Sequence, residues 1–413
     1  MSGEHEGGPS LAAPLAGIRV IDLTTVMMGP YATHQLCALG ASVIKVEPLG
    51  GDSMRAVGPM RNPAMGPMYL NANRGKKSIA LDVKSPDGLA VLHELLAGAD
   101  VFVSNVRSGA LRRLKLDSAT LRGSYPGLIH AVANGFGSGG RYHDRPAYDD
   151  LIQGLAGIPW AAAGAADDGV PRYAAATVAD RVTGLVLANA ILAALFARGK
   201  DGVGRSIEVP MFETMTSFVM GDHLGGLTFE PPNGPPGYAR LLTPGRRPYR
   251  TSDGFVCAVV YTDAHWRAFL AMIGRAELFD ADARFATLGD RTAHIDELYA
   301  LVAQEMPRRT TADWLRLLNA ADIPAAPMHT PQTLLSDPHL GDVGFFEHVE
   351  HPTEGALTQM RYPVRMADTD LPAGEPAPRI GAHSRSILRD LSYDDAAIDR
   401  LFARGVVTGP AAG

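Results

Sequence analysis

The sequence predicts an α/β protein with one domain built on a parallel sheet and a second, smaller α+β domain. Short apolar runs rich in β-branched residues alternate with helical segments along the first third of the 413-residue chain. The runs cover residues 18–23, 43–46, 101–104 and 128–133. Strands that alternate with helices form right-handed βαβ units, which place the strands parallel in one sheet and the helices on its two faces.

Two of the helices between these strands have clear boundary signals. Pro30 suits the first position of one helix, and Gly40 ends it. Ser85 caps a second helix, which begins at Pro86 and is ended by Gly98. Both helices are therefore predicted from local signals at each end.

A third helix is predicted over residues 180–196, where the chain is apolar at most positions. A helix that is apolar nearly all round is a buried one. Asp180 stands at its start, where an aspartate side chain commonly caps a helix. A strand follows around Ile207 and Val209. We find no apolar run long enough to span a bilayer, so no membrane partner is expected.

The smaller domain follows a linker. Residues 225–237 contain two Pro-Pro pairs and several glycines, which is typical of a linker. Residues 249–260 predict a hairpin about the Asp253-Gly254 turn. Further helices of this domain are predicted near residues 264–273, 296–305 and 311–320, and the last stretch of the chain is predicted to end in a helix near residues 394–403.

Charge and cysteine usage indicate a cytoplasmic protein. The net charge of −6 provides no basic surface for nucleic acid. Cys37 and Cys257 are the only cysteines, and their apolar surroundings favour buried thiols over a disulfide, as in a reducing compartment. Residues 1–9 are polar and Gly-rich, which predicts a disordered tail rather than a signal peptide.

Three loops mark the place where a site is expected. They cover residues 24–30, 105–109 and 134–140, and each follows a predicted strand. Because parallel α/β sheets bind ligands outside the carboxyl ends of their strands, we expect these loops to gather at one edge of the sheet. Their position indicates a site without naming its ligand.

Two other patterns resemble known sites but fail the structural requirements of those sites. Residues 135–140 match G-x-G-x-x-G, yet a dinucleotide fingerprint must open a helix, and residues 141–146 are poor helix sequence. His348, Glu350 and His351 resemble a metal-ligand cluster, but a strand would send His351 to the opposite face from the other two. We therefore expect neither a dinucleotide cofactor nor a metal.

A larger set of motifs runs in order along nearly the whole chain. It comprises residues 14–23, 29–30, 39–47, 51–52, 73, 76–84, 99–105, 147–149, 179–180, 183–184, 202–210, 252–254, 266, 323–327 and 337–339. These motifs closely resemble family III CoA-transferases, a family that includes formyl-CoA transferases, carnitine CoA-transferases and α-methylacyl-CoA racemases. Short patterns match by accident, whereas a colinear set of this length does not.

The resemblance implies a Rossmann-like large domain, a small domain and an interlocked homodimer. We divide the chain into a disordered tail (1–12), a first part of the large domain (13–224), a linker with the small domain (225–340), and a return segment that completes the large domain (341–413). The implied substrates are an acyl-CoA and a small carboxylic acid. Coenzyme A is then a substrate and product, with no tightly bound cofactor.

Asp180 stands where the family has its nucleophilic aspartate. A carboxylate at this position attacks the thioester carbonyl and expels CoA thiolate, which leaves a mixed anhydride on the enzyme. The thiolate then attacks the aspartyl carbonyl to form an enzyme–CoA thioester, and the acceptor acid reverses the sequence. A helix N-terminus at Asp180 would help to hold the developing negative charge.

For coenzyme A the resemblance points to ten residues. They are Thr25, Val26, Met27, Met28, Leu81, Lys84, Asn105, Val106, Arg113 and Leu114. Lys84 and Arg113 offer cationic donors to the phosphates. Met27 and Met28 suit either the core or the wall of an acyl or pantetheine channel.

Tyr148 and Asp149 distinguish a transferase from a racemase. The resemblance implies that racemases of the family need a His-Asp pair at this position. The histidine is then one of two bases that exchange the α-proton. A phenol, whose free pKa is about 10, is a poorer base than imidazole at neutral pH. We therefore predict a transferase, in which Asp149 orients an acceptor or is a structural hydrogen-bond partner. The alternatives are a 2-methylacyl-CoA racemase or epimerase and a CoA-binding paralogue without turnover.

Two departures from the oxalate-using relatives bear on the substrate. Thr25 and Met27 replace polar residues of those relatives, which argues against a small dicarboxylate of that kind. Residues 241–247 replace a run of glycines that forms a mobile lid, so a different lid, or none, is implied. Arg246 and Arg247 in this stretch are either carboxylate ligands or solvated charges.

Overall fold

A computed structural model describes residues 11–410 of the chain, which form two compact units. Unit 1 comprises the chain up to Ile152, Ala176–Met215, and the chain from Gly341 on, and unit 2 comprises Gln153–Ala175 and Thr216–Leu340. Most of the predicted tail lies outside the described residues. At its end, Leu11 donates its backbone N–H to the Asp368 carbonyl over 2.8 Å.

The division into units differs from the predicted domain boundaries at residues 153–175 and 216–224, which were assigned to the large domain and belong to unit 2. Helix α7 (Ile158–Gly164) explains the difference, because it packs against α10 (Ala239–Leu242). The Trp160 ring also meets the His223 ring edge to face, with 5.9 Å between centroids. Contacts distant in sequence therefore decide to which unit these segments belong.

Unit 1 is built on a seven-stranded sheet in the order β12-β3-β2-β1-β4-β5-β6. Its strands are β1 Arg19–Leu23, β2 Ser42–Glu47, β3 Lys77–Leu81, β4 Val101–Ser104, β5 Ile129–Asn134, β6 Ser206–Pro210 and β12 Val407–Thr408. All neighbouring strands are parallel except β12, which pairs antiparallel with β3. The predicted α/β class with a parallel sheet is confirmed, and a separate hairpin pairs β10 (Phe346–His351) with β11 (Gly355–Met360).

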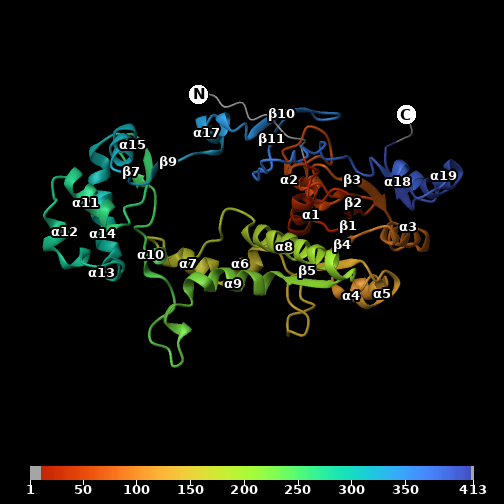
Figure 1. Cartoon of the computed structure of the whole chain (residues 1–413), viewed down its shortest axis with the longest axis horizontal. Helices are drawn as coiled ribbons and strands as arrows, with labels where there is room; N and C mark the ends of the chain where they lie inside the picture. The colour runs from red at the N-terminus through yellow and green to blue at the C-terminus, as the bar shows by residue number, and fades with distance from the viewer. Residues whose placement is uncertain (1–10, 411–413) are drawn as a thin grey trace. The chain divides into compact units, whose positions relative to one another are not determined.

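Helices cover both faces of this sheet. The helices assigned wholly to unit 1 are α1 Met28–Ala38, α2 Pro67–Ala72, α3 Pro86–Ala97, α4 Ser108–Arg113, α5 Ser118–Ser124, α8 Val178–Asp201, α18 Ser384–Asp390 and α19 Asp395–Ala403. One face of the sheet forms an apolar core with α3, α18 and α19, so the C-terminal helices lie beside an early one (Figure 1). On the opposite face, Asp22 of β1 accepts a hydrogen bond from Thr33 of α1.

The boundary signals of α3 are confirmed in detail. Its first residue is Pro86, the Ser85 side chain accepts a hydrogen bond from the Gly88 N–H, and Gly98 is the C-terminal cap. Helix α1 begins at Met28, two residues before Pro30, so the proline lies in its first turn rather than at its first position. A proline is tolerated there because the first N–H groups of a helix have no partner within it.

Unit 2 contains a three-stranded sheet and a set of short helices. Strands β7 (Tyr249–Arg250), β8 (Phe255–Ala258) and β9 (Ala325–Pro327) are antiparallel, which confirms the predicted hairpin. The helices are α7, α10, α11 Asp263–Met272, α12 Leu278–Ala281, α13 Leu288–Ala293, α14 Ile295–Glu305, α15 Thr311–Ala320 and α16 Pro331–Leu334. Helices α6 (Asp149–Ala156), α9 (Met211–His223) and α17 (Pro338–Asp342) span the division between units. Trp266 and Trp314 lie at the centre of the core of unit 2.

The prediction that Asp180 caps helix α8 is wrong. The helix begins at Val178 with Thr177 as the N-cap residue, so Asp180 is the third helical residue. The backbone N–H of Asp180 instead donates to Asp149 Oδ1 over 2.9 Å. A carboxylate from another helix therefore satisfies an N–H group that a local cap would otherwise satisfy.

Helix α8 is longer and less buried than predicted. It covers Val178–Asp201, whereas the sequence predicted a buried helix over residues 180–196. The prediction that no apolar run is long enough to span a bilayer is wrong for this helix, because Val178–Asp201 could cross a membrane by length and composition, although buried helices of globular proteins pass the same test. In this chain it packs against α1, β5 and β6. It is not buried all round, because Leu185, Val186 and Phe196 are exposed.

The histidines near residue 350 have the predicted strand geometry. Strand β10 places His348 and Glu350 on an exposed face and His351 on a buried one. His351 Nε2 lies 2.9 Å from the Ala377 carbonyl, and its Nδ1 accepts the Thr353 N–H, so this ring has a structural role. Within residues 11–410 no group of three His, Cys, Asp or Glu side chains is placed to hold a metal.

Candidate active site

The three loops predicted to meet at one edge of the sheet line a single pocket in unit 1. It has a volume of about 210 Å³. Its lining residues are Thr25, Val26, Met28, Asn105, Arg107, Ser108, Ala133, Asn134, Gly135, His143, Arg145, Pro146, Ala147, Tyr148, Asp180 and Met211. The pocket lies where β1, β4 and β5 end, which is the position at which open α/β sheets bind ligands.

The loop between β1 and α1 is held by hydrogen bonds from side chains on other elements. The Asn105 amide accepts the Thr25 N–H over 3.0 Å and donates to the Thr25 carbonyl over 2.8 Å. Asp52 Oδ1 accepts the Val26 N–H over 3.1 Å. Val26 has φ +70°, a left-handed conformation that a β-branched residue rarely adopts, at a cost of about 1–3 kcal/mol. These bonds therefore fix a strained loop at the pocket.

Buried charges lie beneath this loop. Lys76 Nζ is 3.0 Å from Asp22 Oδ2, and Lys45 Nζ is 2.9 Å from Asp52 Oδ2, with all four side chains inaccessible to solvent. Burial alone would raise the pKa of Asp22, but the charges of Lys76 and Lys45 outweigh it and lower that pKa to about 2. Lys45 also donates to the Thr24 carbonyl over 2.8 Å. The network thus connects the sheet to the loop.

Asp180 is a buried carboxylate that faces the pocket. Its side chain lies in the first turn of α8, and the residue is only 8% exposed. Burial and the nearby charge of Asp149 together raise the pKa of Asp180 to about 7, although the charge of Arg181 lowers it. A carboxyl group that titrates near neutral pH in a pocket is typical of a functional residue.

Tyr148 and Asp149 have different environments although they are neighbours in sequence. Tyr148 lines the pocket and is 70% exposed. Asp149 is buried in the first turn of α6 and accepts the Asp180 N–H. Asp149 therefore contacts the backbone that carries Asp180, whereas Tyr148 presents its ring to solvent.

The ten residues expected at coenzyme A divide into two groups. Thr25, Val26, Met28 and Asn105 line the pocket. The remaining six, Met27, Leu81, Lys84, Val106, Arg113 and Leu114, do not.

These six residues lie either in the core of unit 1 or at its surface. Met27 is fully buried, which fits the core alternative. The Leu81 side chain is buried in the apolar core of unit 1, so it does not face the pocket. Val106 and Leu114 pack partly against the same core, while Lys84 and Arg113 are exposed.

Three basic residues of the pocket were missed by the sequence analysis. They are Arg107, His143 and Arg145. The segment 141–146 was judged only as poor helix sequence, although it contains two arginines and a histidine directly before Tyr148 and Asp149. This cluster of charges was the signal that could have identified His143 and Arg145, whereas Arg107 lies in the predicted loop 105–109.

The glycine-rich segment after β5 is not a dinucleotide loop. The Gly137 N–H donates to Glu213 Oε1 and the Ser138 N–H to Glu208 Oε1, each over 2.9 Å. Carboxylates of the chain itself thus occupy N–H groups that would face a pyrophosphate. Residues 141–146 form turns rather than a helix, as expected.

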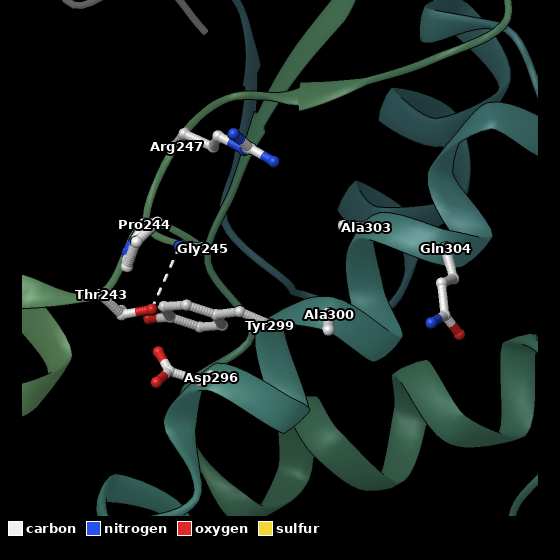
Figure 2. Close-up of a pocket in the computed structure, with 9 residues that line it drawn as sticks. All are labelled: Thr243, Pro244, Gly245, Arg247, Asp296, Tyr299, Ala300, Ala303 and Gln304. Atoms are coloured by element: carbon white, nitrogen blue, oxygen red, sulfur yellow. Dashed lines mark hydrogen bonds between the residues drawn. The ribbon is translucent and has the colours of Figure 1, made fainter. Parts of the chain in front are cut away.

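Unit 2 has a hollow of its own, of about 480 Å³, next to α14 (Figure 2). The Tyr299 ring lies beside Thr243, whose Oγ1 accepts the Gly245 N–H over 3.1 Å. Arg247 lines this hollow and forms an ion pair with Asp167, in which both side chains are exposed, so its charge is solvated at the surface. The hollow is larger than the pocket of unit 1, but it contains no buried carboxylate.

A buried carboxylate with a raised pKa, set among loops at the carboxyl edge of a parallel sheet, defines the active site of an α/β enzyme. Comparison with known proteins gives its family. The family model for CoA-transferase family III matches residues 15–384. The chain therefore belongs to CoA-transferase family III, and it is a transferase.

Individual relatives agree with this assignment. A succinate–glutarate CoA-transferase of Agrobacterium fabrum is 33% identical over 93% of this chain and 97% of its own length. A succinyl-CoA:glutarate CoA-transferase of Mus musculus is 30% identical over 95% of this chain and 90% of its own length. The crystal structure of a mutant of Rv3272 from Mycobacterium tuberculosis has a TM-score of 0.79 at 29% identity, covering 91% of this chain and 99% of that one.

Proposed function

We propose that the chain moves coenzyme A between an acyl-CoA and a small carboxylic acid, with Asp180 as the covalent nucleophile. The observation that carries the proposal is the position of Asp180, a buried carboxylate that lines the pocket from the first turn of α8. Its partial desolvation favours attack, because a carboxylate stripped of water is a stronger nucleophile than a hydrated one.

The reaction then proceeds in two matched halves. The Asp180 carboxylate attacks the thioester carbonyl and expels CoA thiolate, giving a mixed anhydride. The thiolate attacks the aspartyl carbonyl, which releases the donor acid and leaves an enzyme–CoA thioester. The acceptor carboxylate attacks this thioester, and the expelled thiolate finally takes the acceptor acyl group from the second anhydride. Because Asp180 lies in the first turn of α8, the positive end of the helix dipole stabilises negative charge that develops beside this carboxylate.

A panel of acyl-CoA donors against carboxylic acids tests the proposal, with the CoA products identified by mass spectrometry. We expect new acyl-CoA species that match the acceptor acid. Small acyl groups should react better than long fatty acyl groups, because the pocket of about 210 Å³ is below the usual range for drug-sized ligands. Exchange of the α-proton of a 2-methylacyl-CoA into deuterated water without any acceptor would instead indicate a racemase.

The pH dependence of the reaction should follow the ionisation of Asp180. Because only the carboxylate form attacks, kcat/KM should rise about tenfold per pH unit below the pKa of about 7 and level off above it. Replacing Asp149 with asparagine removes a neighbouring negative charge, so the rise should move to lower pH. A profile that is flat between pH 5 and 8 in the original protein would contradict this role.

We further propose a homodimer in the cytoplasm. Exposed apolar side chains on α8 support the dimer, since Phe196 is 69% exposed and lies on the same helix as the exposed Leu185 and Val186. The free thiols of Cys37 and Cys257 support a reducing compartment.

Light scattering tests the homodimer. We expect about twice the 43.8 kDa of one chain, and Phe196→Asp should weaken the assembly. A mass of a single chain at micromolar concentration would contradict the dimer.

A further inference from the structure

We infer that Arg107 and Arg145 select an acid with a second carboxylate, so that the acyl groups transferred are those of short diacids. The inference rests on the proposed function. It concerns the same pocket of unit 1 and adds the class of acid that fits this pocket.

The charges that line the pocket are unbalanced. Arg107, Arg145 and His143 lie in its wall, and Asp180 is the acidic residue that lines it. Within residues 11–410, the ion pairs between arginines and carboxylates do not include Arg107 or Arg145. Two arginines without an acidic partner therefore line a pocket whose own carboxylate loses its charge while it carries an acyl group or coenzyme A.

Arg145 is also oriented by the chain. Its guanidinium carbon lies 4.2 Å from the centroid of the Tyr142 ring, and its backbone N–H donates to the Tyr142 carbonyl over 2.8 Å. Stacking on an aromatic ring leaves the planar edge of a guanidinium free for hydrogen bonds. That edge matches a carboxylate, which accepts two parallel N–H donors.

The location of the arginines favours a carboxylate over the phosphates of coenzyme A. In a thioester the phosphates lie at the far end of the pantetheine arm from the reacting carbonyl. In a short diacid the second carboxylate lies only a few carbon atoms from it. Because Asp180 and both arginines line one pocket of about 210 Å³, the second arrangement fits and the first does not.

Steady-state kinetics with matched acceptors tests the inference. Glutarate and pentanoate have the same number of carbon atoms and differ in a terminal carboxylate. With succinyl-CoA as donor, we expect the original protein to prefer glutarate in kcat/KM by about 10- to 100-fold, since hydrogen bonds to charged groups have this range of effect. The double variant Arg107→Gln, Arg145→Gln should lose this preference through a higher KM for glutarate, with KM for pentanoate unchanged.

Arg141→Gln is the matched control, because Arg141 is exposed in the same segment but does not line the pocket. The control should keep the preference for glutarate. An unchanged preference in the double variant, or an equal rise of KM for both acceptors together with the CoA donor, would overturn the inference. Failure of the proposed function itself would be seen separately, as the absence of enzyme-bound CoA when the original protein is mixed with succinyl-CoA alone.

Discussion

Asp180→Asn is expected to lower kcat for CoA transfer by about 10⁴- to 10⁶-fold, the range found when a covalent nucleophile is removed. Asparagine has the same size as aspartate and keeps the backbone N–H that donates to Asp149, so the pocket is retained. The loss should therefore be chemical rather than structural. Initial rates with a reactive donor and acceptor, followed by mass spectrometry of the CoA products, measure it.

The same variant should be more stable than the original protein above pH 7. Burial is the main reason that the pKa of Asp180 is raised from 3.8 to about 7. The free energy of unfolding therefore falls as pH rises from 3.8 to about 7, because the unfolded chain loses this proton more readily than the folded one. Asparagine avoids that ionisation. Activity loss combined with a higher melting temperature at pH 8 is the pattern of a functional residue that costs stability.

Asp150→Asn provides the control for this experiment. Asp150 is exposed and lies in the first turn of α6, next to Asp149. Its replacement should leave kcat within about twofold, as for a surface residue without a role. If Asp180→Asn kept a tenth of the original rate, Asp180 would not be the nucleophile.

Asp22→Asn is expected to lower the free energy of unfolding by about 3–5 kcal/mol, the usual cost of removing one partner from a buried ion pair. Asp22 lies 3.0 Å from Lys76 Nζ and accepts hydrogen bonds from Thr24 and Thr33. Asparagine leaves the charge of Lys76 buried without its counter-ion. Urea unfolding at pH 7, followed by hydrogen exchange of the β1 and β2 amides, measures the loss.

The pH dependence of stability gives a second readout of this pair. The pKa of Asp22 is about 2 in the folded chain against 3.8 for the free group, so its contribution is present above pH 3.8 and is lost as pH falls through about 2. Asp201→Asn is the control, because Asp201 pairs with Arg205 at the surface. That change should cost less than about 1 kcal/mol. Equal losses for both variants would contradict a structural role of the buried network.

Local sequence signals predicted those elements whose boundaries depend on nearby residues. Helix α3 has its cap and its stop in the sequence itself, at Ser85 and Gly98, and the β7–β8 hairpin follows from the Asp253-Gly254 turn. The convergence of three loops at one pocket followed from a general property of parallel sheets, which requires only the order of strands and helices.

Features that depend on contacts distant in sequence were predicted less well. Thr177 and Asp180 are both residue types that cap helices, and Asp149 on another helix decides how the Asp180 N–H is satisfied. Arg145 lies in a turn-rich segment, where no local pattern fixes the direction of a side chain.

The central claim is that Asp180 carries coenzyme A during the reaction. The most direct test is to mix the protein with an acyl-CoA donor alone, trap the product with hydroxylamine or borohydride, and map the modified peptide by mass spectrometry. We predict a single modification at Asp180, absent from the Asp180→Asn variant. A modification at another residue, or a reactive donor that leaves no trapped adduct, would contradict the proposed mechanism.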